Sequence, residues 1–279
     1  LKMKKINNID KKTVSGFGYE WEKFNQKSLP KKELLQIFET YFSIFPWHKL
    51  SKQSVGFDLG CGSGRFAKIV APRVKKLHCI DPSSAINVAK LNLINHPNCK
   101  FHNTDVDNMP LQDNSMDFGY SLGVLHHIPD TQKALISCVK KLKPGAPFLL
   151  YLYYKLENRP KYYRFIWILS NILRHIICRL PNGLRYFLSK IIATIIYLPL
   201  ARISLLLEKF GINVSYIPLS VYRNRSFYTM QTDSLDRFGT RLENRFSKKE
   251  IIKMMVKSKL EKIVFHEKTY WCALGFRKK

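Results

Sequence analysis

Apolar and polar residues follow two alternating periods through the middle of the chain. Short apolar runs of strand length occur at Val55–Leu59, Leu77–Ile80, Phe101–Asn103, Met116–Ser121 and Phe148–Tyr153. Stretches with the apolar spacing of helices lie between them, at Arg65–Ala71, Ser83–Asn92 and Thr131–Leu142. Strands that alternate strictly with helices predict a parallel sheet with right-handed crossovers.

Further elements are predicted on both sides of this region. Residues 1–30 are polar and basic with one aromatic patch, and residues 31–50 have the spacing of an amphipathic helix that ends at Pro46. Ser247 and Glu250 fit the capping box of a helix that runs to about Lys257. Two further strands are predicted at Lys262–His266 and Tyr270–Phe276, joined by a tight link at Glu267–Thr269.

Residues 154–246 break the alternation of strands and helices. Phe165–Leu180 is apolar except for one narrow polar stripe on the helix, formed by Ser170, Asn171, Arg174, His175 and Arg179. A turn at Pro181–Gly183 leads to a second apolar stretch, Leu184–Phe210, in which Pro199 predicts a kink. Spanning a bilayer takes about 18–20 apolar residues, and the longest run, Ile191–Ala201, stops short at Arg202, so no spanning helix is expected.

These patterns divide the chain into four parts. They are an N-terminal helical extension (1–50), a core of alternating strands and helices (51–153), a helical insertion (154–246) and a final helix with a hairpin (247–279).

Charge is the one unusual feature of the composition. The chain has 47 Lys+Arg against 20 Asp+Glu, a net charge of +27. Every part is positive, from +4 over residues 55–153 to +10 over residues 154–246. A nucleic-acid binder usually concentrates positive charge on one face or tail, so the even spread favours compositional bias, with a membrane surface next and nucleic acid last.

The six cysteines and the N-terminus bear on location. No two cysteines have metal-ligand spacing, so they are expected to be small core residues in a reducing compartment, and no metal site is expected. The first residues lack an apolar signal core, which argues against secretion and for the cytoplasm.

The strongest local motif is a glycine-rich turn between the first strand and its helix. Asp58 stands in the strand end, and Gly60, Gly62 and Gly64 follow at alternate positions. Glycines let a ligand approach the backbone, and the helix that follows presents free N–H groups to it. A carboxylate before the glycines suits a cationic or amine-bearing ligand better than a phosphate.

Two further acids follow the next two strands. Asp81 comes directly after Leu77–Ile80, where a carboxylate can accept hydrogen bonds from a ribose diol. Asp105 follows the third strand and can accept from an exocyclic amine. Alone, each acid could be a helix cap or a turn residue. Three acids at the same edge of one sheet favour a shared ligand site over three separate local roles.

With these motifs the chain resembles the class I S-adenosylmethionine-dependent methyltransferases, of the broad small-molecule group. The resemblance rests on the loop Asp58–Gly64, on Asp81 and Asp105, and on the segments Met109–Leu111, Asp113–Phe118, Leu125–Ile128 and Leu142–Gly145. It implies a Rossmann-like three-layer α/β sandwich with a seven-stranded, mostly parallel sheet whose last strand is antiparallel.

The resemblance also implies which residues hold S-adenosylmethionine. Asp58, Gly60, Cys61 and Gly62 would surround the methionine part, and Asp81, with Pro82 and Ser83, would bind the ribose. Asp105 and the backbone of Val106 would hold the adenine, and the fourth strand would close the pocket with Ser121, Leu122 and Gly123.

Candidates for the acceptor side are less specific. His126 and His127 follow the fourth strand and could act as bases or simply shape the pocket, with His127 the slightly better candidate. Tyr19 and Trp21 could cover the sulfonium or pack the first helix on the sheet. Tyr222, Arg223, Arg225 and Tyr228 could face the substrate or form a solvated loop.

The sequence therefore predicts a methyltransferase acting on a small-molecule or lipid-linked acceptor. The basic-edged helices of residues 154–246 fit a lid over the acceptor pocket, or helices that lie on an anionic membrane, which would place the protein at the inner face of that membrane. One alternative is an RNA methyltransferase, disfavoured by the absence of an appended RNA-binding module and of an Asn-Pro-Pro-Tyr-type loop; another is a non-catalytic protein that keeps the cofactor pocket as a scaffold. The acceptor and the methylated atom are not predicted.

Overall fold

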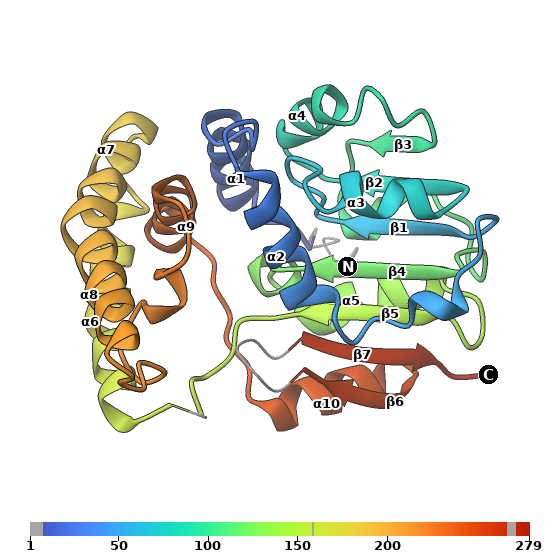
Figure 1. Cartoon of the computed structure of the whole chain (residues 1–279). Helices are drawn as coiled ribbons and strands as arrows, with labels where there is room; N and C mark the ends of the chain where they lie inside the picture. The colour runs from blue at the N-terminus through green and yellow to red at the C-terminus, as the bar shows by residue number, and fades with distance from the viewer. Residues whose placement is uncertain (1–7, 158, 267–271) are drawn as a thin grey trace, which may run out of the picture. The chain divides into compact units, whose positions relative to one another are not determined.

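The computed structural model describes residues 8–157, 159–266 and 272–279, and its contacts divide the chain into two units (Figure 1). We call Leu1–Glu22, Ile37–Lys155 and Leu242–Lys279 the core unit, and Lys23–Gln36 with Leu156–Arg241 the helical unit. The predicted insertion, 154–246, thus has its counterpart in the helical unit, but its last residues and the first part of the predicted N-terminal helix group differently.

The core unit is built on a seven-stranded sheet in the order β3-β2-β1-β4-β5-β7-β6. Neighbouring strands from β3 to β5 pair in parallel, while β7 is antiparallel to both β5 and β6. The expected seven-stranded sheet with an antiparallel last strand is confirmed; the predicted link Glu267–Thr269 lies outside the described residues. The strands are Val55–Leu59 (β1), Lys76–Ile80 (β2), Cys99–His102 (β3), Phe118–Leu122 (β4), Pro147–Tyr151 (β5), Leu260–Phe265 (β6) and Cys272–Arg277 (β7).

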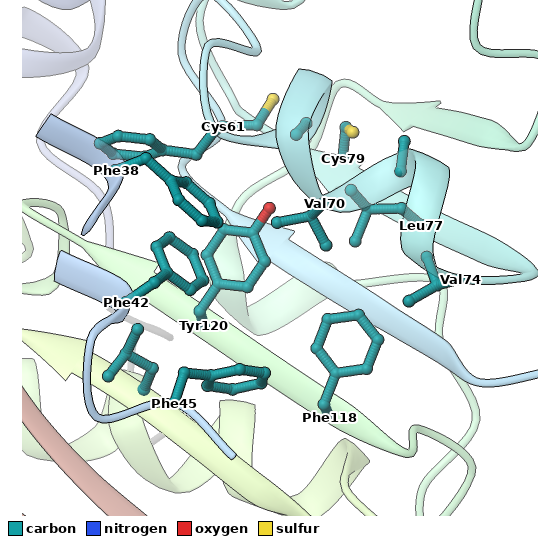
Figure 2. Close-up of a cluster of buried hydrophobic side chains, with 14 of the residues drawn as sticks. Phe38, Phe42, Phe45, Cys61, Val70, Val74, Leu77, Cys79, Phe118 and Tyr120 are labelled. Carbon is teal, nitrogen blue, oxygen red and sulfur yellow. The ribbon is translucent and has the colours of Figure 1, made fainter. Parts of the chain in front are cut away.

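Helices cover both faces of this sheet. One buried cluster contains Phe42 and Tyr120, and the other contains Phe57 and Phe148, because side chains alternate between the two faces of each strand (Figure 2). Residues of α2, α3 and α4 join the first cluster and those of α5 and α10 the second. The helices are Lys11–Lys23 (α1), Lys31–Phe42 (α2), Ala67–Val70 (α3), Ala85–Asn92 (α4), Thr131–Lys141 (α5) and Lys248–Lys257 (α10).

Two helix ends show what sequence reasoning found and missed. The capping box of Ser247 and Glu250 is present at the start of α10. Helix α1 was not predicted, because its polar residues and glycines disfavour a helix in isolation. Tertiary packing explains it: a Cβ on Gly18 would lie 2.5 Å from Ser84 Oγ, so the glycine lets α1 approach the core closely.

The helical unit consists mainly of four helices, α6 (Lys161–Ile177), α7 (Asn182–Ile192), α8 (Leu198–Lys209) and α9 (Phe227–Gly239). Helix α9, which the sequence did not predict, packs against α6 and α7. Their shared core is small and contains Ile177, Ile192, Tyr197, Ala201, Met230 and Phe238.

Helices α7 and α8 form one continuous helix, Asn182–Lys209, of 28 residues. A π-turn at Ala193–Tyr197 precedes Pro199, and this local change of hydrogen bonding lets the helix pass the residue that lacks an N–H. Within the described residues it is the one helix long and apolar enough to cross a membrane, judged by length and composition only. The expectation of no such helix was wrong, because a helix can continue past the charges that end an apolar run.

Glycine and phenylalanine alternate across the junction of β1 and β4. Gly56 pairs with Phe118, and Phe57 with Gly119. A Cβ on Gly56 would lie 2.3 Å from the Phe118 ring, and one on Gly119 2.4 Å from the Phe57 ring. The two fully buried rings therefore occupy the space that side chains at these glycines would need.

Gly119→Ala should therefore destabilise the core unit by overpacking, by about 1–3 kcal/mol in the free energy of unfolding measured by urea denaturation. Gly183→Ala is the control, because a Cβ there has open space, and it should stay within about 0.5 kcal/mol of the parent. Equal stabilities for the two variants would contradict the packing described.

Candidate functional site

The glycine loop is fixed to the carboxyl end of the neighbouring strand. The N–H groups of Gly60 and Cys61 donate to the carbonyl of Ile80 at 2.7 and 3.1 Å. Gly60 and Gly62 have φ of +75° and +52°, a region that favours glycine, and a Cβ on Gly60 would collide with the side chain of Val124. The loop is therefore held between the Ile80 carbonyl at the end of β2 and the side chain of Val124, which follows β4.

Asp58 and Asp81 bring two buried carboxyl groups to this loop. Asp81 accepts hydrogen bonds through one oxygen from the Gly62 N–H (2.9 Å) and through the other from the N–H and hydroxyl of Ser83 (2.9 and 2.6 Å). Burial raises the pKa of Asp58 to about 8, against the lowering effect of the Tyr120 hydroxyl, and the neighbouring Asp81 raises it further. Burial also raises the pKa of Asp81. A ligand cation would stabilise both carboxylates.

The loop holds one more buried polar group that points to a ligand. Ser63 Oγ is fully buried and has no hydrogen-bond partner among the described residues. Cys61 is also buried, whereas Pro82 is only partly so. An unpartnered hydroxyl, two buried carboxyls and bare loop backbone fit a polar, positively charged ligand.

The third acid has a different local role. Asp105 caps the 3₁₀ turn Val106–Asn108, accepting from the N–H groups of Asp107 and Asn108 at 3.0 and 3.1 Å. Val106 is buried beneath it. Asn103 connects this region to the site, since its side-chain amide donates to the carbonyls of Asp81 and Ser83 at 2.9 and 3.0 Å. Asp105 is thus at the expected edge of the sheet, but its carboxylate acts as a cap.

The end of β4 supplies backbone and a small side chain. Ser121 is fully buried and donates its hydroxyl to the carbonyl of Leu59 at 3.1 Å, and Gly123 donates its N–H to the carbonyl of Tyr151 at 3.1 Å. Leu122 is partly exposed between them. These bonds hold the ends of β1, β4 and β5 together.

Trp21 of α1 lies directly on the glycine loop. A Cβ on Gly62 would stand 2.9 Å from Trp21 Nε1, and the guanidinium of Arg65 lies 5.3 Å from the centre of the indole. Glu22 accepts from the Ser84 hydroxyl at 2.5 Å, which fixes the end of α1. Tyr19 is two positions earlier and therefore faces another side of the helix. Of the two predicted aromatic residues, the structure brings Trp21 to the loop.

His126 and His127 lie in the turn Leu125–His127, which follows β4. His126 is fully buried, and neither ring nitrogen has a hydrogen-bond partner among the described residues. Burial, with contributions from His127 and Arg245, holds the pKa of His126 well below its usual range. The ring stacks on Tyr153 at 3.9 Å between centroids, so His126 is a neutral part of an aromatic wall.

His127 has a defined orientation in the same wall. Its Nδ1 lies 2.6 Å from the carbonyl of Leu242, which makes Nδ1 the protonated nitrogen and leaves Nε2 as the basic one. Phe17 of α1 packs against the ring at 4.9 Å. This geometry suits His127 better than His126 for proton transfer.

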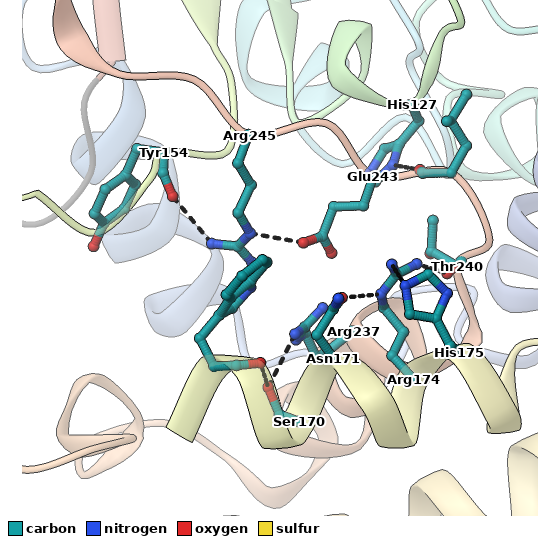
Figure 3. A network of polar contacts seen from close by, with 12 residues as sticks. His127, Tyr154, Ser170, Asn171, Arg174, His175, Arg237, Thr240, Glu243 and Arg245 are labelled. Atoms are coloured by element: carbon teal, nitrogen blue, oxygen red, sulfur yellow. Dashed lines mark hydrogen bonds and ion pairs between the residues drawn. The ribbon is translucent and has the colours of Figure 1, made fainter. Parts of the chain in front are cut away.

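Residues 242–246 complete this side of the core unit, and sequence reasoning missed them. Asn244 and Phe246 donate their N–H groups to the carbonyls of His126 and Tyr153, both at 2.9 Å. Arg245 donates to the nearly buried Glu243 at 2.7 Å and to the Tyr154 carbonyl at 3.1 Å (Figure 3). The sequence assigns residues 242–246 to the insertion. Only their backbone hydrogen bonds to His126 and Tyr153 show that they pack on the core unit.

The four predicted substrate residues do not form a site. Tyr222 donates to Asp233 at 2.8 Å, and Arg223 makes two bonds to Glu208 at 2.7 and 2.8 Å. Arg225 donates weakly to the Glu33 carbonyl at 3.4 Å, and Tyr228 accepts from the Gln26 N–H at 2.9 Å. All four thus bond to other segments of the helical unit, and a role of these residues toward the substrate stays a prediction.

Within the described ranges, no group of three His, Cys, Asp or Glu residues is arranged to hold a metal ion. All six cysteines are free and buried, as expected for core residues.

The raised pKa of Asp58 has a consequence for stability. The native state keeps a proton that the unfolded chain releases between the ordinary pKa of 3.8 and about 8, so this group makes stability fall as pH rises through that window. Asp58→Asn should therefore gain stability relative to the parent by up to about 1.4 kcal/mol per pH unit between pH 5 and 7.5, measured by urea denaturation.

Asp113→Asn is the control for this comparison. Lys141 lowers the pKa of the exposed Asp113, so its substitution should produce at most a small change of the opposite sign. A difference between Asp58→Asn and the parent that does not change with pH would contradict the buried, protonated carboxyl.

Comparison with known proteins finds methyltransferases among the proteins similar to this chain. Residues 57–150 match the family model of the methyltransferase domain. Phosphoethanolamine N-methyltransferase 2 of Caenorhabditis elegans is 36% identical over 102 residues, 35% of this chain and 23% of the relative. A probable tRNA methyltransferase 9B of Bos taurus is 26% identical over 109 residues, 38% and 22% of the two chains. The chain thus matches less than a quarter of the length of either relative.

One solved structure shares the fold over nearly the whole chain. It belongs to the complex between the Haloferax volcanii Trm112 methyltransferase activator and its methyltransferase, with a TM-score of 0.53 and 12% identity over 95% of this chain and 99% of that one. Residues 57–150 thus match a methyltransferase domain, and the sheet with its antiparallel β7 has the fold of the class I S-adenosylmethionine-dependent methyltransferases.

Proposed function

We propose that this protein transfers a methyl group from S-adenosylmethionine to a small-molecule or lipid-linked acceptor. The observation that carries the proposal is the pair of buried carboxyls, Asp58 and Asp81, at a glycine loop that also holds the unpartnered hydroxyl of Ser63. When bound, the cofactor supplies a methyl group on a positively charged sulfur that is open to in-line attack.

The residues at the loop fit this cofactor part by part. Asp58 would accept from the amino group of the methionine part, beside the backbone of Gly60 and Gly62, which have the positive φ of a glycine turn. Asp81 uses three acceptor positions on Gly62 and Ser83, so one lone pair remains for a ribose hydroxyl. Val106 would offer its backbone to the adenine beside the cap of Asp105.

The acceptor side has a wall that excludes water and one group that can move a proton. The stacked rings of His126 and Tyr153 carry no charge, and Phe17 covers the adjoining ring of His127. Nε2 of His127 can take a proton from an acceptor hydroxyl or amine, because the Leu242 carbonyl holds the other nitrogen protonated. Glu243 and Arg245 add a charged pair at the same wall.

RNA is the second candidate acceptor. It is favoured by the net charge of +27 and by the similarity to a probable tRNA methyltransferase. Against it, the positive charge is spread over all parts of the chain rather than gathered on one. For location we propose the cytoplasm, at the inner face of the membrane, and the six free buried cysteines support a reducing compartment.

The experiment that tests the function combines binding and transfer. Calorimetry should detect S-adenosylmethionine binding, and Asp81→Ala should weaken it by about tenfold or more, because the ribose acceptor and the Gly62 anchor are both lost. The parent protein is then incubated with methyl-labelled cofactor and, separately, a lipid extract, a small-molecule extract and total tRNA.

Label in the lipid or small-molecule fraction, absent with Asp81→Ala, is the expected result. Label in tRNA, falling steeply with salt, would replace the acceptor assignment with the RNA alternative. Cofactor binding without transfer to any fraction would favour the non-catalytic scaffold, and unchanged affinity in Asp81→Ala would remove the ribose assignment.

His127→Asn should lower the transfer rate by about 10²-fold or more if Nε2 acts as the base, while cofactor affinity stays within about threefold of the parent. Rate and cofactor affinity falling together would instead indicate that His127 shapes the pocket.

A further inference from the structure

Helix α6 has its polar and apolar faces reversed relative to a helix of a water-soluble core. Three residues of its polar stripe point inward, with Arg174 4% exposed and Ser170 and Asn171 partly buried, whereas His175 and Arg179 are exposed. Its large apolar side chains are mostly exposed, at Phe165, Ile166, Ile168, Leu169, Ile172 and Ile176. Their spacing of three and four residues makes one continuous apolar stripe along the helix.

Specific hydrogen bonds hold the polar stripe inside the helical unit. Arg174 donates to the carbonyls of Thr240 and Arg241 at 2.8 and 2.9 Å and to the Asn171 side chain at 2.9 Å. Arg237 of α9 donates to the Ser170 hydroxyl at 2.9 Å (Figure 3). The inward orientation of α6 is therefore built in, since turning the helix over would break all of these bonds.

The continuous helix Asn182–Lys209 repeats the reversal. Arg185, 6% exposed, donates to the Gly239 carbonyl at 2.9 Å, and Ser189 is buried with its carbonyl accepting from Ser234 at 2.8 Å. Its exposed apolar residues follow helical spacing, at Leu184, Phe187, Ile191, Ile195, Ile203 and Leu206. We call the two stripes together the apolar face of the helical unit.

In water, an amphipathic helix gains stability by burying its apolar stripe. Single exposed apolar residues are ordinary, but two long helices that both expose such stripes mark a surface that meets something less polar than water.

The charge of these helices indicates which less polar partner the apolar face contacts. Residues 161–209 hold eight Lys+Arg, of which only Arg174 and Arg185 are buried, and one acidic residue, Glu208. Lys161, Arg164, Lys190 and Lys209 are exposed along these helices. A second copy of the chain on this face would bring like charges together, whereas anionic lipid headgroups would neutralise them.

The positions of the charges also indicate depth. The exposed Lys190 and Arg202 are twelve residues apart, about 18 Å along a helix, which is shorter than a hydrocarbon core of about 30 Å. The helix is therefore better suited to lie in the interface than to cross the bilayer.

We propose that the apolar face of the helical unit binds the surface of an anionic lipid bilayer, with the stripes of α6 and of Asn182–Lys209 inserted among the acyl chains and the flanking Lys and Arg at the headgroups. This partner does not depend on the methyl-transfer function, but it would give the enzyme access to lipid-linked acceptors.

Vesicle flotation of the full chain tests the proposal. Vesicles of phosphatidylcholine and phosphatidylglycerol in equal parts should carry the protein upward, and phosphatidylcholine alone should do so more weakly. The double variants Phe165→Ser with Ile172→Ser, and Phe187→Ser with Ile195→Ser, should each weaken partitioning into the mixed vesicles by about tenfold or more, because inserted apolar area is lost.

The matched control is Leu91→Ser with Ile94→Ser, which removes two exposed apolar side chains from the core unit, 65% and 76% exposed, and should leave flotation unchanged. Circular dichroism confirms that each variant is folded. No flotation, or flotation abolished by salt but unaffected by either double variant, would overturn the proposal. A dimer in sedimentation equilibrium that Phe165→Ser with Ile172→Ser converts to monomer, without vesicle binding, would assign the face to a second copy instead.

Discussion

The fold removes two carboxyl groups from water at neighbouring strand ends, and the candidate chemistry depends on that constraint. Asp58 and Asp81 each raise the free energy of the unliganded site because burial disfavours their charged forms. Backbone and hydroxyl donors compensate Asp81, whereas Tyr120 and Arg65 offset only part of the effect of burial on the pKa of Asp58. A cationic ligand would reduce this cost, because it would stabilise the charged forms of the two carboxyls.

The remainder of the core unit positions backbone around those carboxyls. Parallel strands bring the ends of β1, β2 and β4 to one edge, and the Gly–Phe pairs between β1 and β4 keep two of them in close contact. Helix α1 covers the loop with Trp21, and residues 242–246 return to the His126–Tyr153 wall by backbone pairing. Segments far apart in the sequence thus supply the cofactor side and the acceptor side of one site.

The two units differ in how they partition polar and apolar residues. The core unit buries phenylalanine, leucine and isoleucine between sheet and helices, as expected for a domain that is stabilised by the hydrophobic effect in water. The helical unit buries arginines and serines, satisfied by backbone carbonyls, and exposes aliphatic stripes. Such a unit is better matched to a lipid interface, because its apolar outer face would contact acyl chains there instead of water. Its inner polar groups would keep their hydrogen-bond partners.

The sequence alone determined the alternating core, the order of its strands and helices, the glycine loop and the position of each acid at a strand end. These follow from local periodicity and from residues whose backbone preferences do not depend on distant contacts. Only the tertiary structure decided that Asp105 caps a turn, that Tyr222, Arg223, Arg225 and Tyr228 bond to other segments of the helical unit, that residues 242–246 pair with the backbone of His126 and Tyr153 and that α6 is turned with its apolar face outward. Most of those outcomes depend on partners far away in the chain. The spacing of apolar residues predicts that a helix has an apolar face, but not whether that face packs against the protein or lies on its surface.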